Sequence, residues 1–191
     1  MNTVIHTLGD ADTLSLVGFS SKATTVFRSL RMDEAGFPHH LEPLLLIPGA
    51  RIGKAEAQRQ LGSLHASGQT NLWDGLLHGM EAVGDGGEGR LGAVLLLTDG
   101  LPNIAPPRGT VAMLQRYRES HPRRSCTIST FGFGYNLDSP QLGEIAREGQ
   151  GMYAFIPDAS FVGTAFVNAA SNLLTTMAAQ VHPPLPPPPP P

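Results

Sequence analysis

A run of five apolar residues that ends at a carboxylate and a glycine constrains the fold of this chain most. Residues 93–97 are apolar at successive positions, and Thr98-Asp99-Gly100 follow them directly. A half-exposed strand would alternate apolar and polar residues, so this run is typical of a strand covered on both faces, as in a parallel sheet between helices. The sequence therefore predicts a buried strand over about 91–98, with Asp99 at its carboxyl end.

Other segments alternate between strand and helix patterns. Expected strands lie at 13–19, 23–30, 126–133 and 152–156, and expected helices at 1–8, 54–65, 71–83, around 111–117, 139–149 and 160–177. Strands that alternate with helices indicate an α/β, doubly wound, Rossmann-like domain with a mostly parallel sheet and helices on both faces.

Two of the expected helices carry clear apolar faces. Ala57, Leu61 and Leu64 mark the helix over 54–65, because they recur at helical spacing. The helix over 71–83 has Leu72, Leu76, Met80 and Val83 on one face, and Thr70 is its expected N-cap. Asp138 or Ser139 is expected to cap the helix that is entered through Pro140.

Composition excludes several classes of function. The 191 residues have a net charge of −3 and no basic run longer than a pair, so nucleic acid is not an expected partner. The single cysteine, Cys126, excludes an internal disulfide and fits a reducing compartment. No signal peptide and no run long enough to span a membrane is visible. We expect a cytoplasmic protein that does not bind membranes.

The chain divides into one domain and a tail. Residues 1–180 form the expected domain, and residues 36–53, which three prolines interrupt, form a loop insertion within it. Residues 181–191 end in six prolines and are expected to adopt polyproline II. This tail is either an idle spacer or a ligand for the aromatic grooves of SH3, WW or EVH1 domains.

Thr70 and Asp99 are the candidate site residues. Ligands of open α/β sheets bind beyond the carboxyl ends of the strands, where both residues are expected. A hydroxyl and a carboxylate are hard oxygen ligands suited to Mg²⁺ or Mn²⁺. Each residue also has a structural interpretation, because Thr70 can cap a helix and Asp99 can shape a turn. No catalytic or cofactor-binding residue is predicted, because no nucleophile–base pair, nucleophile elbow or phosphate-binding loop is evident.

Four stretches resemble one known family. They are Leu14-Ser15-Leu16-Val17-Gly18-Phe19-Ser20-Ser21, Gly68-Gln69-Thr70-Asn71-Leu72-Trp73-Asp74-Gly75-Leu76, Leu96-Leu97-Thr98-Asp99-Gly100 and Thr130-Phe131-Gly132-Phe133-Gly134. In this order they resemble the von Willebrand factor A (vWA) domain of the intracellular fungal and plant type. The family usually carries a metal-ion-dependent adhesion site (MIDAS) built from three loops, and the resemblance assigns Thr70 to the second loop and Asp99 to the third.

The resemblance also implies two missing parts. The first MIDAS loop, Asp-x-Ser-x-Ser, and the opening strand that leads into it are absent from this chain. That strand would lie at the centre of the sheet, between 13–19 and 91–98. Its absence predicts an N-terminally truncated vWA domain, or a sequence in which 36–53 is translated non-coding sequence. The two flanking strands would either leave unpaired edges or close up directly, or be joined in part by residues 44–47.

The expected function follows from the resemblance and from the two parts of the family's domain that this chain lacks. It implies a non-enzymatic protein–protein interaction module with a degenerate MIDAS, which binds another protein at residues 67–74, 99–105 and 134–138. Two ligands leave about four positions of a hexacoordinate cation to water, so we expect Mg²⁺ or Mn²⁺ affinity of about 1 mM or weaker. The alternative is a scaffold or accessory segment that acts through its polyproline tail.

Overall fold

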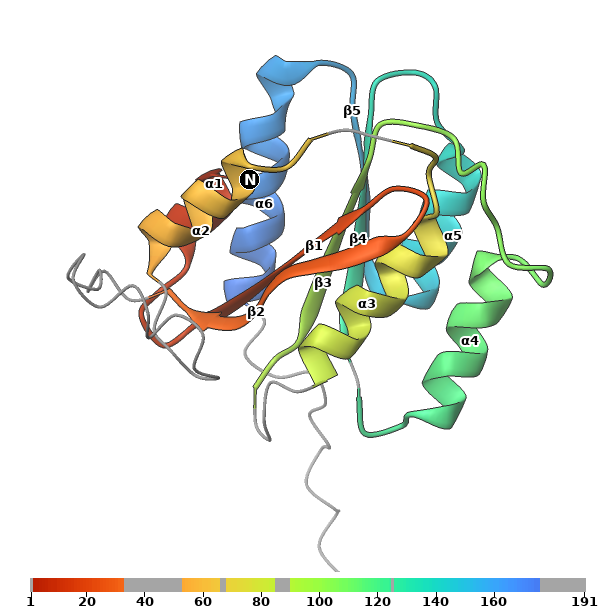
Figure 1. Cartoon of the computed structure of the whole chain (residues 1–191), viewed down its shortest axis with the longest axis horizontal. Helices are drawn as coiled ribbons and strands as arrows, with labels where there is room; N and C mark the ends of the chain where they lie inside the picture. Colours follow the sequence, from red (N-terminus) through yellow and green to blue (C-terminus); the bar gives the residue numbers. More distant parts are fainter. Residues whose placement is uncertain (1, 33–52, 66–67, 85–89, 125, 176–191) are drawn as a thin grey trace, which may run out of the picture.

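The computed structural model describes residues 2–32, 53–65, 68–84, 90–124 and 126–175. Helices lie on both sides of the strands, with α3, α4 and α5 on one side and α1, α2 and α6 on the other (Figure 1). The predicted loop insertion at 36–53, apart from Gly53, and the predicted tail at 181–191 fall outside these residues. Within the described residues, no helix is both long enough and apolar enough to cross a membrane.

The order of elements follows the predicted alternation. The strands are β1 (Thr13–Phe19), β2 (Ala23–Arg31), β3 (Ala93–Thr98), β4 (Thr127–Phe133) and β5 (Gln150–Ile156). The helices are α1 (Asn2–Thr7), α2 (Lys54–Gly62), α3 (Leu72–Gly84), α4 (Thr110–Ser120), α5 (Ser139–Glu148), the short 3₁₀ helix η2 (Ala159–Phe161) and α6 (Val162–Thr175).

The described strands form two sheets. β1 and β2 pair antiparallel, while β3, β4 and β5 form a parallel sheet in that order. A parallel sheet flanked by helices confirms the predicted α/β, Rossmann-like class. β1 and β3 are not paired with each other. One predicted alternative was that the strands at 13–19 and 91–98 pair directly with each other, and this pairing is not formed.

The core of the parallel sheet has two unequal faces. Val94 and Leu96 of β3 are buried against α3, α4 and α5. Leu95 and Leu97 point to the opposite side, where they pack against Phe131 but remain partly exposed. The apolar run thus lies in a parallel sheet as predicted, although α1 and α6 cover its second face less completely.

A separate core lies beneath the β1–β2 hairpin. Its buried members include Ile5 of α1, Leu16 of β1 and Ala57 of α2. Leu8 contacts both this core and the core beneath β3. On the other side, α3 packs against β1, β2 and β3. α1, with Leu8 beyond its end, and α3 therefore connect the two sheets from opposite faces.

The boundaries of α2 and α3 differ from the predictions in ways that change the role of a named residue. α2 ends at Gly62, so Leu64 lies beyond the helix and its side chain is 41% exposed. α3 begins at Leu72, and the Asn71 side chain accepts a hydrogen bond from the Asp74 amide at 3.2 Å. Asn71 is therefore the N-cap, and the prediction that Thr70 caps this helix was wrong by one residue.

Candidate functional site

The carboxyl ends of β1 and β3 meet at one edge of the molecule. We call this edge the carboxyl rim and define it as residues 20–22, 68–71, 98–104 and 133–138. The segment 68–71, which precedes α3, lies between the β1–β2 turn and the loop that follows β3. The rim therefore contains both predicted site residues, Thr70 and Asp99.

Hydrogen bonds attach the segment 68–71 to the β1–β2 turn. The Asn71 amide donates to the Ser20 carbonyl at 2.8 Å, and the Gln69 amide donates to Oγ of Ser21 at 3.1 Å. Gly68 has a φ of +74°, and a β-carbon there would lie 2.9 Å from Oγ of Ser21. Only glycine suits this backbone conformation and this close approach.

Asn103 attaches the other side of the same segment to the loop after β3. Its side-chain Oδ1 accepts from the Thr70 amide at 2.6 Å, and its own amide donates to the Thr70 carbonyl at 3.2 Å. The Ile104 amide donates to the same carbonyl at 3.3 Å. The backbone of Thr70 is thus fixed on both sides. Sequence reasoning did not single out Asn103, although an asparagine in the loop that follows a strand was a usable signal.

Thr70 lies against the turn that carries Asp99. Its hydroxyl oxygen is 3.6 Å from the position that a β-carbon on Gly100 would occupy. Within the described residues no hydrogen bond to this hydroxyl is found, because Asn71 provides the helix cap. The structure therefore places Thr70 beside the residue that follows Asp99, at the same rim.

Asp99 stands at the edge of an apolar hollow. Its side chain is exposed, as expected for a residue that leaves a strand at its carboxyl end. The hollow has a volume of about 360 Å³ and lies at the carboxyl ends of the parallel strands, where it is lined by Leu97, Thr98, Asp99, Phe131, Phe133, Ile156 and Val162. An acidic group beside an apolar hollow is an arrangement that can bind the apolar part and the polar part of one ligand.

Exposed aromatic side chains continue this surface. Tyr135 follows β4 and is 84% exposed, and its ring lies edge-on to Phe155 with a centroid separation of 5.5 Å. Phe155 is 44% exposed and Phe133 is 37% exposed. Exposed aromatic residues are enriched where proteins bind one another.

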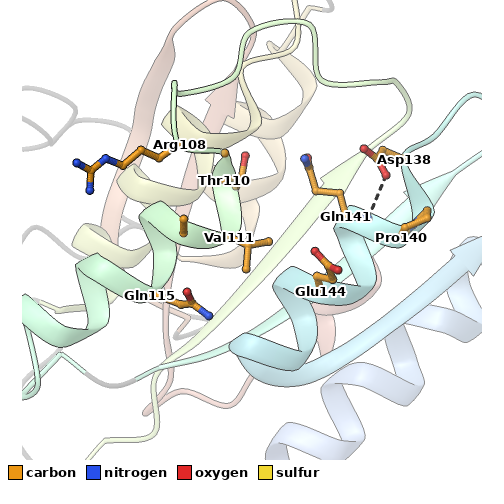
Figure 2. A pocket seen from close by; sticks show the side chains of 10 residues that line it. Arg108, Thr110, Val111, Gln115, Asp138, Pro140, Gln141 and Glu144 are labelled. Carbon is orange, nitrogen blue, oxygen red and sulfur yellow. Dashed lines mark hydrogen bonds between the residues drawn. The ribbon is translucent and has the colours of Figure 1, made fainter.

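A second, polar hollow lies between α4 and α5 (Figure 2). Its volume is about 510 Å³. Asp138 at its upper end accepts a hydrogen bond from the Gln141 amide at 3.0 Å and is the N-cap of α5, which decides between the two predicted caps. Glu144 and Gln115 line the lower part, one from each helix. Neither Thr70 nor Asp99 lines this hollow.

Asp74 holds the hairpin against α3. Its Oδ2 accepts from the Ala23 amide at 2.6 Å, and its Oδ1 lies 3.5 Å from Nδ1 of His78. Asp74 lies in the first turn of α3, where a carboxylate interacts favourably with the helix dipole, and the bond from Ala23 adds a contact between residues far apart in the chain. Asp74 is therefore engaged in structure rather than directed to the rim.

The donor set at the rim does not fit a tightly held metal ion. Thr70 and Asp99 supply one hydroxyl and one carboxylate, and no group of three or more His, Cys, Asp or Glu side chains suited to a metal is found in the described part of the chain. Mg²⁺ requires about six oxygen ligands in near-octahedral geometry. One carboxylate also neutralises only half of the charge of the ion.

Comparison with known proteins identifies the fold. No protein-family model matches the sequence, and no curated protein matches it. Among solved structures, a von Willebrand factor type A protein from Catenulispora acidiphila matches with a TM-score of 0.73 and 21% identity over 91% of this chain, which spans 36% of that protein. BatB from Bacteroides thetaiotaomicron matches with a TM-score of 0.65 and 15% identity over 91% of this chain and 84% of BatB.

A third structure carries a metal. Proximal thread matrix protein 1 from the mussel byssus, described with a zinc-occupied MIDAS motif, matches with a TM-score of 0.60 and 18% identity over 90% of this chain and 38% of that protein. These likenesses show that the chain has a vWA-type fold, as its four sequence stretches predicted.

Proposed function

We propose that the chain is a protein–protein interaction module that binds its partner through the carboxyl rim. The observation that carries this proposal is the double attachment of the segment 68–71 to the β1–β2 turn and to the loop after β3. This attachment preorganises Thr70 beside Gly100, so a partner meets a fixed surface and loses little free energy to loop ordering.

The chemistry of the rim favours a partner with both polar and apolar groups. The hollow beside Asp99 and the exposed ring of Tyr135 offer apolar contact area, while the Thr70 hydroxyl offers one hydrogen bond. A vWA-type fold, and the likeness to a mussel protein described with a MIDAS motif, support an interaction role rather than a catalytic one. We therefore propose a non-enzymatic, cytoplasmic protein.

Metal binding at this rim is proposed to be weak. Thr70 and Asp99 would hold Mg²⁺ or Mn²⁺ with about four water molecules completing the coordination, so most of the partner contact is metal-free. With a dissociation constant of about 1 mM, 10 mM Mg²⁺ stabilises the folded state by about 1.4 kcal/mol. For a chain of this size, that corresponds to a rise in Tm of about 3–6 °C.

The test compares rim variants with a tail deletion. In a pull-down experiment, the double variant Thr70→Ala/Asp99→Ala should no longer bind the proteins that the wild-type chain captures. Thr70→Ser and the exposed-loop variant Asp10→Ala should still bind them. Removal of residues 183–191 should leave the captured set unchanged. The alternative, a scaffold that acts through its six terminal prolines, gives the reverse pattern. A rise in Tm with Mg²⁺ that persists in Asp99→Ala would overturn the metal assignment.

A further inference from the structure

We propose that the polar hollow between α4 and α5 binds a ligand that carries a carboxylate and, at a distance from it, a cationic group. Two sources have this chemistry: a free basic amino acid, and the carboxyl end of a polypeptide whose last residue is basic. The volume of about 510 Å³ lies within the range of about 300–1,000 Å³ typical of small-ligand sites. The hollow shares only Asp138 with the carboxyl rim, so this site is separate from the contact proposed above.

The first turn of α4 presents unpaired backbone donors to the hollow. Gly109 is at the N-cap with a φ of +79°, which favours glycine, and no side chain caps this helix. Among the described residues, the amides of Thr110, Val111 and Ala112 have no hydrogen-bond acceptor, and all three residues line the hollow. Unpaired amides at the start of an 11-residue helix carry a partial positive charge, so they favour a carboxylate.

Two polar side chains in the walls of the hollow are buried without a partner. Thr110 is 2% exposed, and no hydrogen bond to its hydroxyl is found in the part of the chain that the structure describes. On the α5 side, Oε1 of Gln141 is buried and also has no partner there (Figure 2). A buried polar group that stays unpaired costs free energy. One such group on each wall indicates a polar ligand that supplies the missing hydrogen bonds.

The charges around the hollow decide which kind of ligand fits. Asp138, the N-cap of α5, and Glu144 are both acidic, and Glu144 is exposed. Arg108 also lines the hollow, but its guanidinium points away from α5 (Figure 2). A simple anion such as phosphate would therefore meet two carboxylates with no cation of the lining turned towards it. A ligand with its carboxylate at the start of α4 and its cationic group at Glu144 is attracted at both ends.

The spacing along α5 sets the length of the ligand. α4 follows β3 and α5 follows β4 in one parallel sheet, so both helices begin at the same end of the molecule. Glu144 lies about 9 Å further along the helix axis than Asp138. Because helical side chains tilt towards the N-terminus, the Glu144 carboxylate is closer to the start of the hollow than this. The long side chains of lysine and arginine separate their cationic group from the α-carboxylate by a comparable length.

Nuclear magnetic resonance of the full chain tests this proposal with small probes. Nα-acetyl-lysine, which has the carboxylate and the ammonium group, should shift the amide signals of Thr110, Val111 and Ala112. Nα-acetyl-lysinamide lacks the carboxylate and Nα-acetyl-norleucine lacks the ammonium group, so each should bind about tenfold or more weakly. Free lysine identifies the source. Affinity at least equal to that of Nα-acetyl-lysine indicates a free amino acid, and lower affinity indicates the end of a polypeptide.

Matched variants test the two walls. Thr110→Val keeps the shape of the side chain and removes the hydroxyl, so affinity for Nα-acetyl-lysine should fall about fivefold while Tm does not fall. Glu144→Gln should weaken binding of Nα-acetyl-lysine about tenfold and leave that of Nα-acetyl-norleucine unchanged. Glu119→Gln alters an exposed acid of α4 outside the hollow and should bind like the wild type. Rim variants of Thr70 and Asp99 should also leave this binding unchanged, which separates this proposal from the proposed function.

Three results would overturn the proposal. Unshifted signals of Thr110, Val111 and Ala112 would show that the probe does not bind here. Equal affinities of the three acetylated probes would show that neither charge is recognised. A lower Tm of Thr110→Val with unchanged affinity would show that the hydroxyl stabilises the fold rather than a ligand.

Discussion

Leu96→Ala and Leu95→Ala compare two neighbouring leucines that face opposite sides of β3. Leu96 is 4% exposed and lies in the core formed with α3, α4 and α5, while Leu95 is only partly buried on the other face. Truncating an enclosed leucine removes its transfer free energy and leaves a cavity. Leu96→Ala should therefore lower the free energy of unfolding by about 2–5 kcal/mol.

The expected loss for Leu95→Ala is smaller. A fully buried leucine contributes about 1.5–3 kcal/mol, and a partly buried one contributes roughly half of that, with no closed cavity left behind. We therefore expect a loss of about 1 kcal/mol for Leu95→Ala. At about 2–4 °C per kcal/mol in a chain of this length, the Tm values of the two variants should differ by several degrees.

Urea denaturation followed by circular dichroism measures both losses. Equal slopes of unfolding free energy against urea for the wild type and both variants would show that the comparison reports stability rather than a changed unfolded state. Equal losses for Leu95→Ala and Leu96→Ala would refute the reasoning, because they would mean that both faces of β3 are covered to the same extent.

Two further predictions concern titratable groups. Burial raises the pKa of the Cys126 thiol, with a smaller opposing effect from the charge of Arg118. A thiol reagent at pH 8 should therefore modify Cys126 much more slowly in the native chain than in urea. Equal rates in the two conditions would contradict the burial of this side chain. The hydrogen bonds from the Ser160 hydroxyl and amide lower the pKa of Asp158 below its ordinary 3.8. The stabilisation from Asp158 should therefore be present above pH 3.8 and lost as the pH falls through the lowered pKa, and Asp158→Asn should remove this part of the acid dependence in thermal unfolding.

The strands and helices could be predicted where the periodicity was strong. The unbroken apolar run at 93–97 correctly indicated a parallel sheet, and Leu72, Leu76 and Met80 are all buried on the inner face of α3. The end of α2 was less predictable. Leu64 continued the apolar spacing, but the chain leaves the helix at Gly62, and glycine is a common helix terminator.

The contacts of the rim could be predicted only in part. Thr70 and Asn71 are both good capping residues at adjacent positions, and nothing local decides between them. The choice depends on Asn103, which bonds to the Thr70 backbone from another loop and leaves Asn71 to cap α3. The bond from the Ala23 amide to Asp74 is likewise a contact between distant segments. Such contacts arise from tertiary packing, which a single sequence does not encode in any local pattern.

The division between the two sheets has a consequence for how the molecule opens. The core beneath the β1–β2 hairpin, with Phe27 and Met32, is distinct from the cores beneath β3, β4 and β5. Regions with separate cores and few shared backbone bonds can unfold at different free energies. The hairpin with α2 should thus form one cooperative unit and the parallel sheet another.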